Sequence, residues 1–340
     1  MKVAIGYHIQ NGPWGGGNQF ARSLVEALEA RGDQVRFDLD DDDIDVLVMT
    51  DPRGRSPNVS FHAGSILRYL LLRNPRAIVV HRINECDERK GTRHMNPLLK
   101  RANYVADHTV FIAGWLADLD LWQRESPSSV ILNGGDTRVF NPSGHVPWSG
   151  VGPLRLVTHH WGGNRLKGFD VYEFLDRMLA DPAWKGRLEF TYVGNLPRGV
   201  SLPNTRYLKP MDGATLAAEL ASHHAYVTGS VNEPAGMHHI EGALCGLPLI
   251  YRESGALPEY CAGFGIGISG PDDLPAALER LMAEYGLHHT AMAAYPNSAE
   301  KMCAGYLAVI DDLVARHDAI VAARRLWRNP WLVLRNQLPL

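Results

Sequence analysis

Short apolar runs alternate with stretches of helical periodicity along the first part of the chain. The pattern predicts strands at residues 3–7 and 35–39 and an amphipathic helix at 19–31 between them. Further buried strands are predicted at residues 44–49, 77–81 and 108–112, with helical stretches such as 65–73 between them. This alternation indicates a mostly parallel sheet with helices on both faces.

Residues 141–153 concentrate Pro, Gly and Ser and are interpreted as an interdomain linker. The alternation then restarts, with strands predicted at 154–158, 188–193, 226–228 and 249–251 and helices at 170–179, 214–221 and from about 237. The result is two doubly wound halves. Because ligands bind beyond the carboxyl ends of strands in such sheets, a cleft between the halves is the expected site.

Length and composition agree with a two-domain soluble protein. The 340 residues suit two domains of about 150 residues each. Charged residues make up 21% of the chain, and the formal charge of −3 offers no basic footprint for nucleic acid, so no nucleic-acid partner is expected.

Cysteine usage and the lack of long apolar segments indicate a cytoplasmic protein. The four cysteines, Cys86, Cys245, Cys261 and Cys303, show no CxxC spacing, which favours free thiols in a reducing compartment. The first residues do not match a signal peptide, and no apolar stretch approaches the roughly 20 residues that span a bilayer.

The strongest chemical signal is the segment 233–259, EPAGMHHIEGALCGLPLIYRESGALPE. Glu233 and Pro234 follow a short predicted strand and precede a predicted helix, whose first backbone N–H groups suit an anion. Glu241 lies eight residues after Glu233, about 12 Å along a helix axis. This separation suits an extended ligand with one carboxylate near each end.

The same segment resembles the Glu-x7-Glu pattern of retaining GT-B glycosyltransferases, particularly the family 4 group. The residues that follow are similar to that family's Glu-Ala-x-Ala-x-Gly-x-Pro-Val and Gly-x-Pro-Glu motifs. The resemblance implies that Glu233 contacts the transferred sugar and Glu241 the ribose. The turn expected to hold the donor diphosphate comprises Pro234, Ala235, Gly236 and Met237. The alternative is a pair of helix-flanking glutamates on a solvated face.

A second signal lies in residues 158–172, THHWGGNRLKGFDVY. A glycine-rich loop that carries a cation before a helix is a phosphate cradle in physical terms. Lys167 is expected to neutralise the donor diphosphate as the sugar–phosphate bond breaks. The family has a Lys-Gly here and an arginine several residues earlier; this chain has Arg165 only two residues before the lysine and Trp161 farther back. The assignment of Arg165 to the donor therefore stays open against a surface position.

The glycine-rich segment at residues 12–28 resembles the family's N-terminal Gly-Gly loop, which implies donor contact for Gly16 and Gly17. The glycines could also serve only a tight turn. An alternative is an NAD-binding fingerprint, since an acidic residue follows about 20 residues later. Phe20 stands where that fingerprint needs its third glycine.

Two further segments of the first half match the family. Residues 131–142, ILNGGDTRVFNP, resemble the segment that ends its N-terminal domain. The expected domains are 1–145 (acceptor side), 146–310 (donor side) and a crossing-back helix and tail at 311–340. His81 ends a predicted strand, where family members often place a catalytic histidine; a hydrogen-bonded structural role is the alternative. The charged cluster after it, residues 85–90, faces either the acceptor or solvent.

Four His-His pairs, 159/160, 223/224, 238/239 and 288/289, raise the question of a metal. Neighbouring side chains diverge by about 100° on a helix and point to opposite faces of a strand, so neither arrangement forms a chelate. No metal and no other cofactor is therefore expected.

The C-terminal tail alternates arginines with tryptophans and leucines. Such a pattern is typical of an interfacial membrane anchor, and its candidate residues are Arg324, Arg325, Trp327, Arg328 and Trp331. The alternative is packing of these side chains against the N-terminal domain.

Together these observations predict a GT-B protein of two Rossmann-like domains that face each other across a cleft. The resemblance implies a retaining, metal-independent glycosyltransferase with a UDP- or GDP-linked sugar donor and a carbohydrate, lipid-linked or small-molecule acceptor. The tail adds possible contact with the inner membrane face. An epimerase-type enzyme, a non-catalytic nucleotide-sugar module and a dehydrogenase are the alternatives.

Overall fold

The computed structural model describes residues 1–10, 12 and 15–337, which fall into two compact units. The first unit contains residues 1–10, 16–132 and 300–337, and the second contains residues 12, 15 and 133–299. Each unit is built on a six-stranded parallel sheet, as the strand–helix alternation predicts. Pro13 and Trp14 of the glycine-rich loop lie outside the described residues.

The first sheet has the strand order β2-β1-β3-β4-β5-β6. Its strands are β1 (Lys2–Ile5), β2 (Gln34–Arg36), β3 (Val46–Met49), β4 (Ile78–Ile83), β5 (His108–Phe111) and β6 (Ser128–Val130). Its helical elements are α1 (Gly16–Arg31), α2 (Ala63–Leu72), α3 (Met95–Ala102), η1 (Asn103–Val105), α4 (Trp115–Asp118), α11 (Ala299–Ala315), α12 (His317–Ala323) and α13 (Pro330–Gln337).

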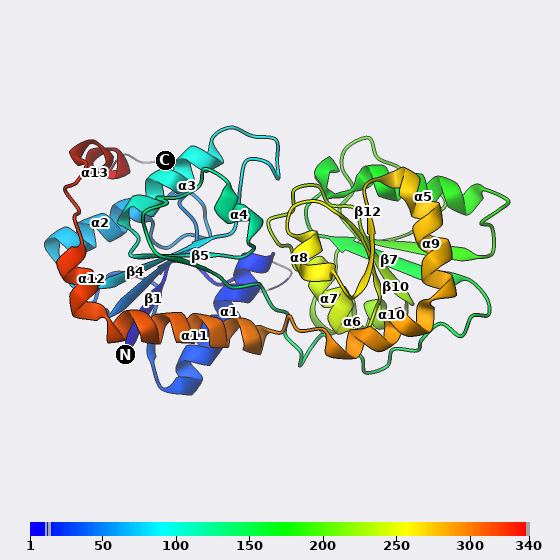
Figure 1. Ribbon diagram of the computed structural model, residues 1–340, viewed down its shortest axis with the longest axis horizontal. Coiled ribbons are helices and arrows are strands. Elements are labelled where there is room, and N and C mark those ends of the chain that lie inside the picture. Colours follow the sequence, from blue (N-terminus) through cyan, green and yellow to red (C-terminus); the bar gives the residue numbers. More distant parts are fainter. Residues whose placement is uncertain (11, 13–14, 338–340) are drawn as a thin grey trace. The chain divides into compact units, whose positions relative to one another are not determined.

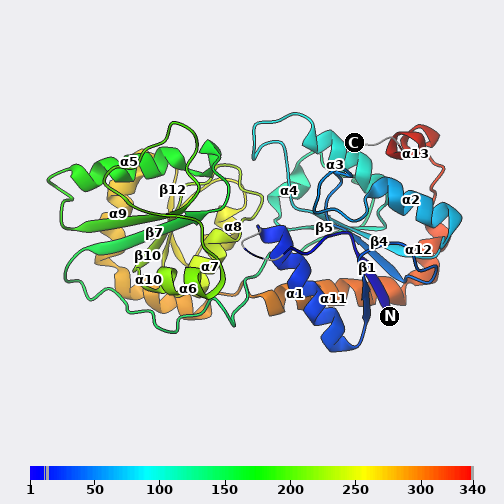
Figure 2. The same cartoon turned by 180° about the vertical axis from the view of Figure 1, so that it is seen from behind.

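Successive residues of the first sheet's strands face opposite cores, because side chains alternate along a strand. Val3 and Ile5 pack with α1 and α11 on one face, while Ala4 packs with α2 on the other. Figures 1 and 2 show α1 and α11 together on one side of this sheet and α2, α3 and α13 on the opposite side.

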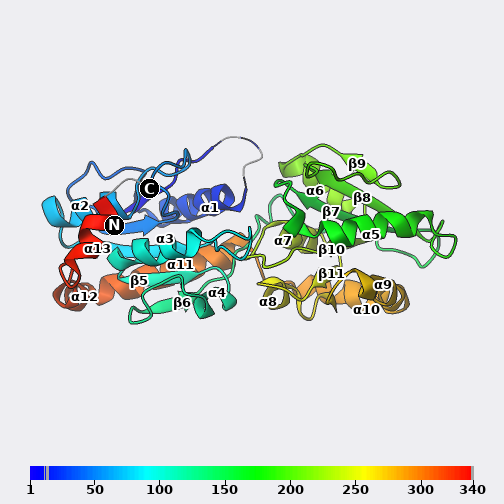
Figure 3. The same ribbon diagram turned by 90° about the horizontal axis from the view of Figure 1, so that it is seen from above.

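The second sheet has the order β12-β11-β10-β7-β8-β9, most of which can be followed in Figure 3. Its strands are β7 (Leu154–His160), β8 (Leu188–Gly194), β9 (Arg206–Leu208), β10 (Ala225–Thr228), β11 (Leu249–Arg252) and β12 (Gly265–Ile268). Its helices are α5 (Phe169–Ala180), α6 (Gly213–Ala221), α7 (His238–Leu244), α8 (Leu257–Cys261), α9 (Leu274–Ala283) and α10 (Tyr285–Ala291), with short 3-10 turns η2 (Arg165–Lys167), η3 (Pro271–Asp273) and η4 (Met292–Ala294). The chain reverses direction across the sheet between β7 and β10, the switch point where such sheets bind ligands.

The segment read as a linker belongs to the second unit, so the border lies at residues 132/133 and not near 145. Gly135 accepts from the Ala299 N–H at 2.8 Å and donates to the Asn297 carbonyl at 3.1 Å. A Cβ on Gly134 would lie 1.8 Å from the Ser298 carbonyl oxygen, so only glycine permits this approach. Composition indicates a loop, but it does not show on which core the loop packs.

The C-terminal tail packs on the first unit. Arg324 forms an ion pair with Asp107 at 2.6 Å, and both side chains are buried. The Arg328 guanidinium lies 4.0 Å from the centre of the Tyr104 ring. The predicted lipid contact of Arg324 is therefore wrong, because this side chain pairs with Asp107 inside the unit.

Among the helices within residues 1–10, 12 and 15–337, none combines the length and the apolar character needed to cross a bilayer.

Candidate functional site at the switch point of the second unit

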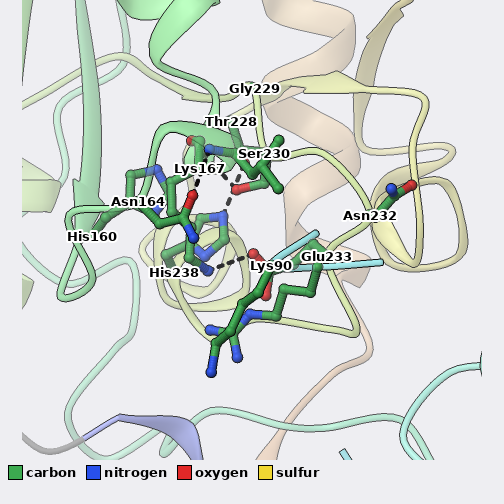
Figure 4. Close-up of polar contacts among 12 residues, drawn as sticks. Lys90, His160, Asn164, Lys167, Thr228, Gly229, Ser230, Asn232, Glu233 and His238 are labelled. Atoms are coloured by element: carbon green, nitrogen blue, oxygen red, sulfur yellow. Dashed lines mark hydrogen bonds and ion pairs between the residues drawn. The ribbon is translucent and has the colours of Figure 1, made fainter. Parts of the chain in front are cut away.

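Lys167 and Glu233 meet beyond the carboxyl ends of β7 and β10. The Lys167 Nζ lies 2.5 Å from Glu233 Oε2, and the carboxylate is buried. Lys167 ends the short turn η2, and Glu233 lies in the loop after β10. The structure thus joins two residues that the sequence assigned to one donor site from motifs 66 positions apart (Figure 4).

Glycines allow the two loops to touch. Gly168 has φ +96°, and a Cβ there would lie 2.3 Å from the carbonyl carbon of Gly229. The loops are also joined by a 2.8 Å hydrogen bond from the Val231 N–H to the Leu166 carbonyl. Gly168 therefore permits the contact between the two loops that brings Lys167 to Glu233.

The backbone of Glu233 is held from both sides. Asn232 before it has φ +49°, an uncommon left-handed conformation that asparagine tolerates better than most residues. Its N–H donates to Ser254 Oγ at 2.9 Å. The Glu233 carbonyl accepts from Ala256 at 2.9 Å, and a Cβ on Gly255 would lie 2.6 Å from the Glu233 nitrogen. Uncommon backbone conformations of this kind concentrate at functional sites.

The turn after Glu233 differs from the expectation. Helix α7 begins at His238, so Pro234 lies before the helix and not in its first turn. A helical rise therefore does not apply between Glu233 and the helix start. Pro234 and Ala235 are buried, while Gly236 and Met237 are half-buried. Gly236 has φ +73°, and a Cβ there would lie 2.8 Å from the His238 ring.

Glu241 is buried on α7 and contacts β7. Its Oε2 lies 2.7 Å from His159 Nε2. Because Glu233 and Glu241 each keep only 3% of their surface exposed, the interpretation as glutamates on a solvated face is wrong.

Three more histidines, His160, His238 and His239, form a cluster of neighbouring rings at this end of the sheet. The rings of His160 and His238 lie 4.5 Å apart, and His238 and His239 lie 5.0 Å apart. His160 contacts the Tyr172 hydroxyl at 2.6 Å, and His238 contacts Thr228 Oγ1 at 2.8 Å, as Figure 4 shows for the latter. Burial lowers the pKa of His160 and His238 well below the usual range and that of His239 to about 3. These rings are neutral and add no positive charge beside Lys167.

Sequence reasoning missed this histidine cluster. It tested each His-His pair as a chelate by itself, whereas the fold brings 159/160 beside 238/239. A usable signal was present, since polar residues at the carboxyl end of β7 stand where doubly wound sheets bind ligands. In the described part of the chain, no three His, Cys, Asp or Glu side chains form a group that could hold a metal ion.

Arg165 does not join the Lys167–Glu233 contact. Its guanidinium lies 3.5 Å from Glu173 on α5, and 59% of the side chain is exposed. Its assignment to the donor stays a prediction that this geometry does not support.

His81 lies inside the first unit. It sits within β4, which continues to Ile83, and its ring is fully buried. The Asn103 amide contacts its Nδ1 at 3.0 Å and also donates to Thr109 Oγ1 at 2.8 Å. Burial lowers the pKa of His81 to about 3. This is the geometry of the structural alternative and not of a histidine open to a substrate.

The remaining candidates of the first unit lie at the start of α1 and in the charged cluster after β4. Gly16 and Gly17 begin α1 and are half-buried. In the charged cluster, Glu85 binds Arg89 at 2.8 Å, and Asp87 accepts from the backbone of Met95 at 2.9 Å at the start of α3. The cluster therefore shapes its own loop.

Solved structures match this chain over most of its length. A sucrose-phosphate synthase from Thermosynechococcus elongatus matches with a TM-score of 0.65 at 16% identity, covering 92% of this chain and 99% of that one. HepE of Anabaena, in complex with UDP, gives 0.66 at 12% identity, covering 92% and 100%. AviGT4, a glycosyltransferase involved in avilamycin A biosynthesis, gives 0.61 at 14% identity, covering 92% and 98%. The chain has the two-domain GT-B fold of these proteins.

No family model and no curated protein matches the sequence.

Proposed function

We propose that this protein is a glycosyltransferase that moves a sugar from a nucleoside diphosphate to an acceptor hydroxyl. The observation that carries the proposal is the 2.5 Å contact between Lys167 and Glu233 at the switch point of the second unit. A cation suited to phosphate stands beside a carboxylate suited to sugar hydroxyls. Such a pair would flank the bond that breaks in a sugar diphosphate.

The donor's remaining parts follow from the neighbouring residues. Glu241 would bind the ribose hydroxyls, and the backbone of residues 234–237 would bind the diphosphate. UDP is the first nucleotide to test, because HepE was solved with UDP and with UDP-glucose. The acceptor is a carbohydrate or a lipid-linked glycan.

In the proposed mechanism, Lys167 stabilises negative charge that grows on the leaving diphosphate. Preorganised charge of this kind often contributes most to catalysis. Glu233 orients the sugar, and the leaving phosphate accepts the proton of the acceptor hydroxyl. As in the family 4 enzymes that the motifs resemble, the sugar keeps its anomeric configuration.

A thermal-shift screen against UDP, GDP, ADP, TDP and NAD tests the proposal. A diphosphate present at 100 times its Kd should stabilise the protein by roughly 2.7 kcal/mol. Stabilisation by NAD alone would contradict the proposal. NMR of the products formed from the matching nucleotide sugar then separates transfer with retention from inversion and from epimerisation.

For the C-terminal tail, the proposed partner is an anionic lipid surface at the inner membrane face. Trp327 and Trp331 keep 62% and 65% of their surface exposed, and Arg325 and Arg335 are exposed beside them. Amphipathic indole rings with arginines suit the headgroup region of a bilayer.

Sedimentation with vesicles tests this contact. The protein should pellet with phosphatidylglycerol vesicles more than with phosphatidylcholine vesicles, and W327A/W331A should lose most of that binding. L287A removes another exposed apolar side chain and serves as the control. Equal pelleting of W327A/W331A and wild type would contradict the proposal.

A further inference from the structure

The contact between His159 and Glu241 links the central strand of the second sheet to α7. His159 is the residue before the last in β7, with its backbone registered against Val193 of β8. Its ring is buried, with Nε2 2.7 Å from Glu241 Oε2. The two residues are 82 positions apart, so the fold and not local sequence makes this contact.

Tyr226 on β10 holds the other side of the histidine ring. Its hydroxyl lies 3.1 Å from His159 Nδ1 and accepts the His159 backbone N–H at 2.9 Å. The two rings meet edge to face with centroids 5.6 Å apart. His159 is therefore fixed at both ring nitrogens and at its backbone.

The hydrogen bonds in this chain of contacts follow from donor and acceptor chemistry. A carboxylate accepts, so Nε2 of His159 donates to Glu241 Oε2. Burial raises the pKa of Tyr226 well above its usual range, so this phenol keeps its hydrogen. Its hydroxyl contacts His159 Nδ1 at 3.1 Å and the His159 carbonyl at 3.3 Å. The contacts thus link Tyr226 through His159 to Glu241.

A glycine brings α7 close enough for this contact. Gly242 directly follows Glu241, and a Cβ there would lie 2.4 Å from the Tyr226 ring. The same tyrosine thus packs on the helix through its ring and holds His159 through its hydroxyl. Tyr226 therefore contributes to the position of α7 and, through His159, to the orientation of the Glu241 carboxylate.

We propose that His159, held by Tyr226, is a positioning residue that aims the Glu241 carboxylate at the ribose hydroxyls and so sets the preference for ribonucleotides. The proposal rests on the proposed function, in which Glu241 binds the ribose. One carboxylate oxygen is oriented by His159, and a carboxylate offers about four lone-pair sites, enough to accept from a ribose as well. Loss of the His159 hydrogen bond removes a contact that orients the carboxylate, so the ribose contact weakens more than the phosphate contact.

Calorimetric titration with UDP and GDP, each beside its 2′-deoxy form, tests the proposal. Wild type should prefer the ribose form of its nucleotide by about tenfold, as expected for one hydrogen bond to a charged group. H159L should lose about tenfold in affinity for that form, with a ribose-to-deoxyribose ratio near one. H159Q should recover much of the ratio, because its amide can donate as Nε2 does. In an E241A background, H159L should add little further loss.

H223L is the control for losing a buried histidine. His223 lies in the same unit and binds Thr191 Oγ1 at 2.9 Å and the Glu219 carbonyl at 2.8 Å, so H223L should keep the wild-type ratio. Equal losses for both nucleotide forms in H159L, or an unchanged ratio, would overturn the positioning role while leaving the proposed function standing. Binding of neither diphosphate by wild type would overturn the proposed function itself.

Discussion

Two buried ion pairs of similar length, one taken from each unit, differ in their surroundings. Arg324 and Asp107 of the first unit lie 2.6 Å apart, with 6% and 7% of their side chains exposed. Lys167 and Glu233 of the second lie 2.5 Å apart, with 12% and 3% exposed. Distance and burial alone do not separate a structural pair from a functional one.

The places of the two pairs in the fold do separate them. Arg324 contacts both oxygens of Asp107 and also donates to the carbonyls of Pro75 and Ala77 at 2.7 Å. Its planar group is held in one place, which ties the tail to the sheet. Lys167 contacts Glu233 Oε2 from a loop at the switch point of the second sheet. The pair that ties the tail to the sheet maintains the fold, whereas the other pair lies where doubly wound sheets bind ligands.

The largest expected effect is on the structural pair. R324M should lower the free energy of unfolding by about 3–5 kcal/mol, because Asp107 would be left buried without its partner. Urea unfolding measures the change. R76A removes an exposed ion pair with Asp318 and should change stability by less than about 1 kcal/mol. Equal losses of unfolding free energy in R324M and R76A would contradict the distinction between the buried and the exposed ion pair.

The proposed donor-site pair, Lys167 and Glu233, should show its effect in turnover. E233Q should lower kcat by about 10²–10³-fold, which corresponds to roughly 3–4 kcal/mol. K167A should weaken binding of the diphosphate as well. Release of the diphosphate from the donor sugar measures both. R165A, on the same loop, should retain activity within a few fold, and an E233Q variant as active as wild type would contradict the role of this pair.

The next largest effect is expected where Gly168 approaches Gly229, at the contact between the loops that carry Lys167 and Glu233. G168A should lower the free energy of unfolding by about 2–3 kcal/mol, since φ +96° is strained for alanine and the Cβ meets Gly229. G162A, in the same loop with nothing within 4 Å of the added Cβ, should change it by less than about 0.5 kcal/mol. Chemical denaturation compares them, and similar losses would contradict the close approach.

Neutral buried histidines in both units predict a dependence of stability on pH. Burial lowers the pKa of His81 and His239 to about 3 in the folded protein, against about 6.5 when unfolded. Between these values the unfolded chain binds more protons, so stability is lost as pH falls below about 6.5, by about 1.4 kcal/mol per pH unit for each histidine. Urea unfolding at pH 7 and 5.5 should show this loss. H239F should reduce the slope by about one proton, and an unchanged slope would contradict neutral burial of His239.

The sequence was sufficient for most of the architecture. Apolar runs such as residues 188–193 and 249–251 appear as β8 and β11, because buried parallel strands need continuous apolar segments. Three short strands were not predicted. β6 and β9 are three residues long and largely exposed, and β12 alternates glycine with isoleucine, so none has a distinct apolar run.

Lys167 and Glu233 were each indicated by a separate motif, and the structure brings their side chains into contact. The site was not predictable where partners come from distant strands, as for His159 with Glu241. His81 shows the opposite case, a residue that the sequence indicated as catalytic and that the structure buries in the core. A polar residue in a strand has the same sequence signal whether it binds a substrate or, as here, an asparagine inside the core.

Titration of wild type, K167A, E241A and R165A with UDP and GDP tests the central claim most directly. The account predicts that wild type binds one diphosphate, that K167A and E241A bind it at least tenfold more weakly, and that R165A binds it within a few fold of wild type. Wild-type affinity in both K167A and E241A would contradict the assignment of the donor site to the switch point of the second unit.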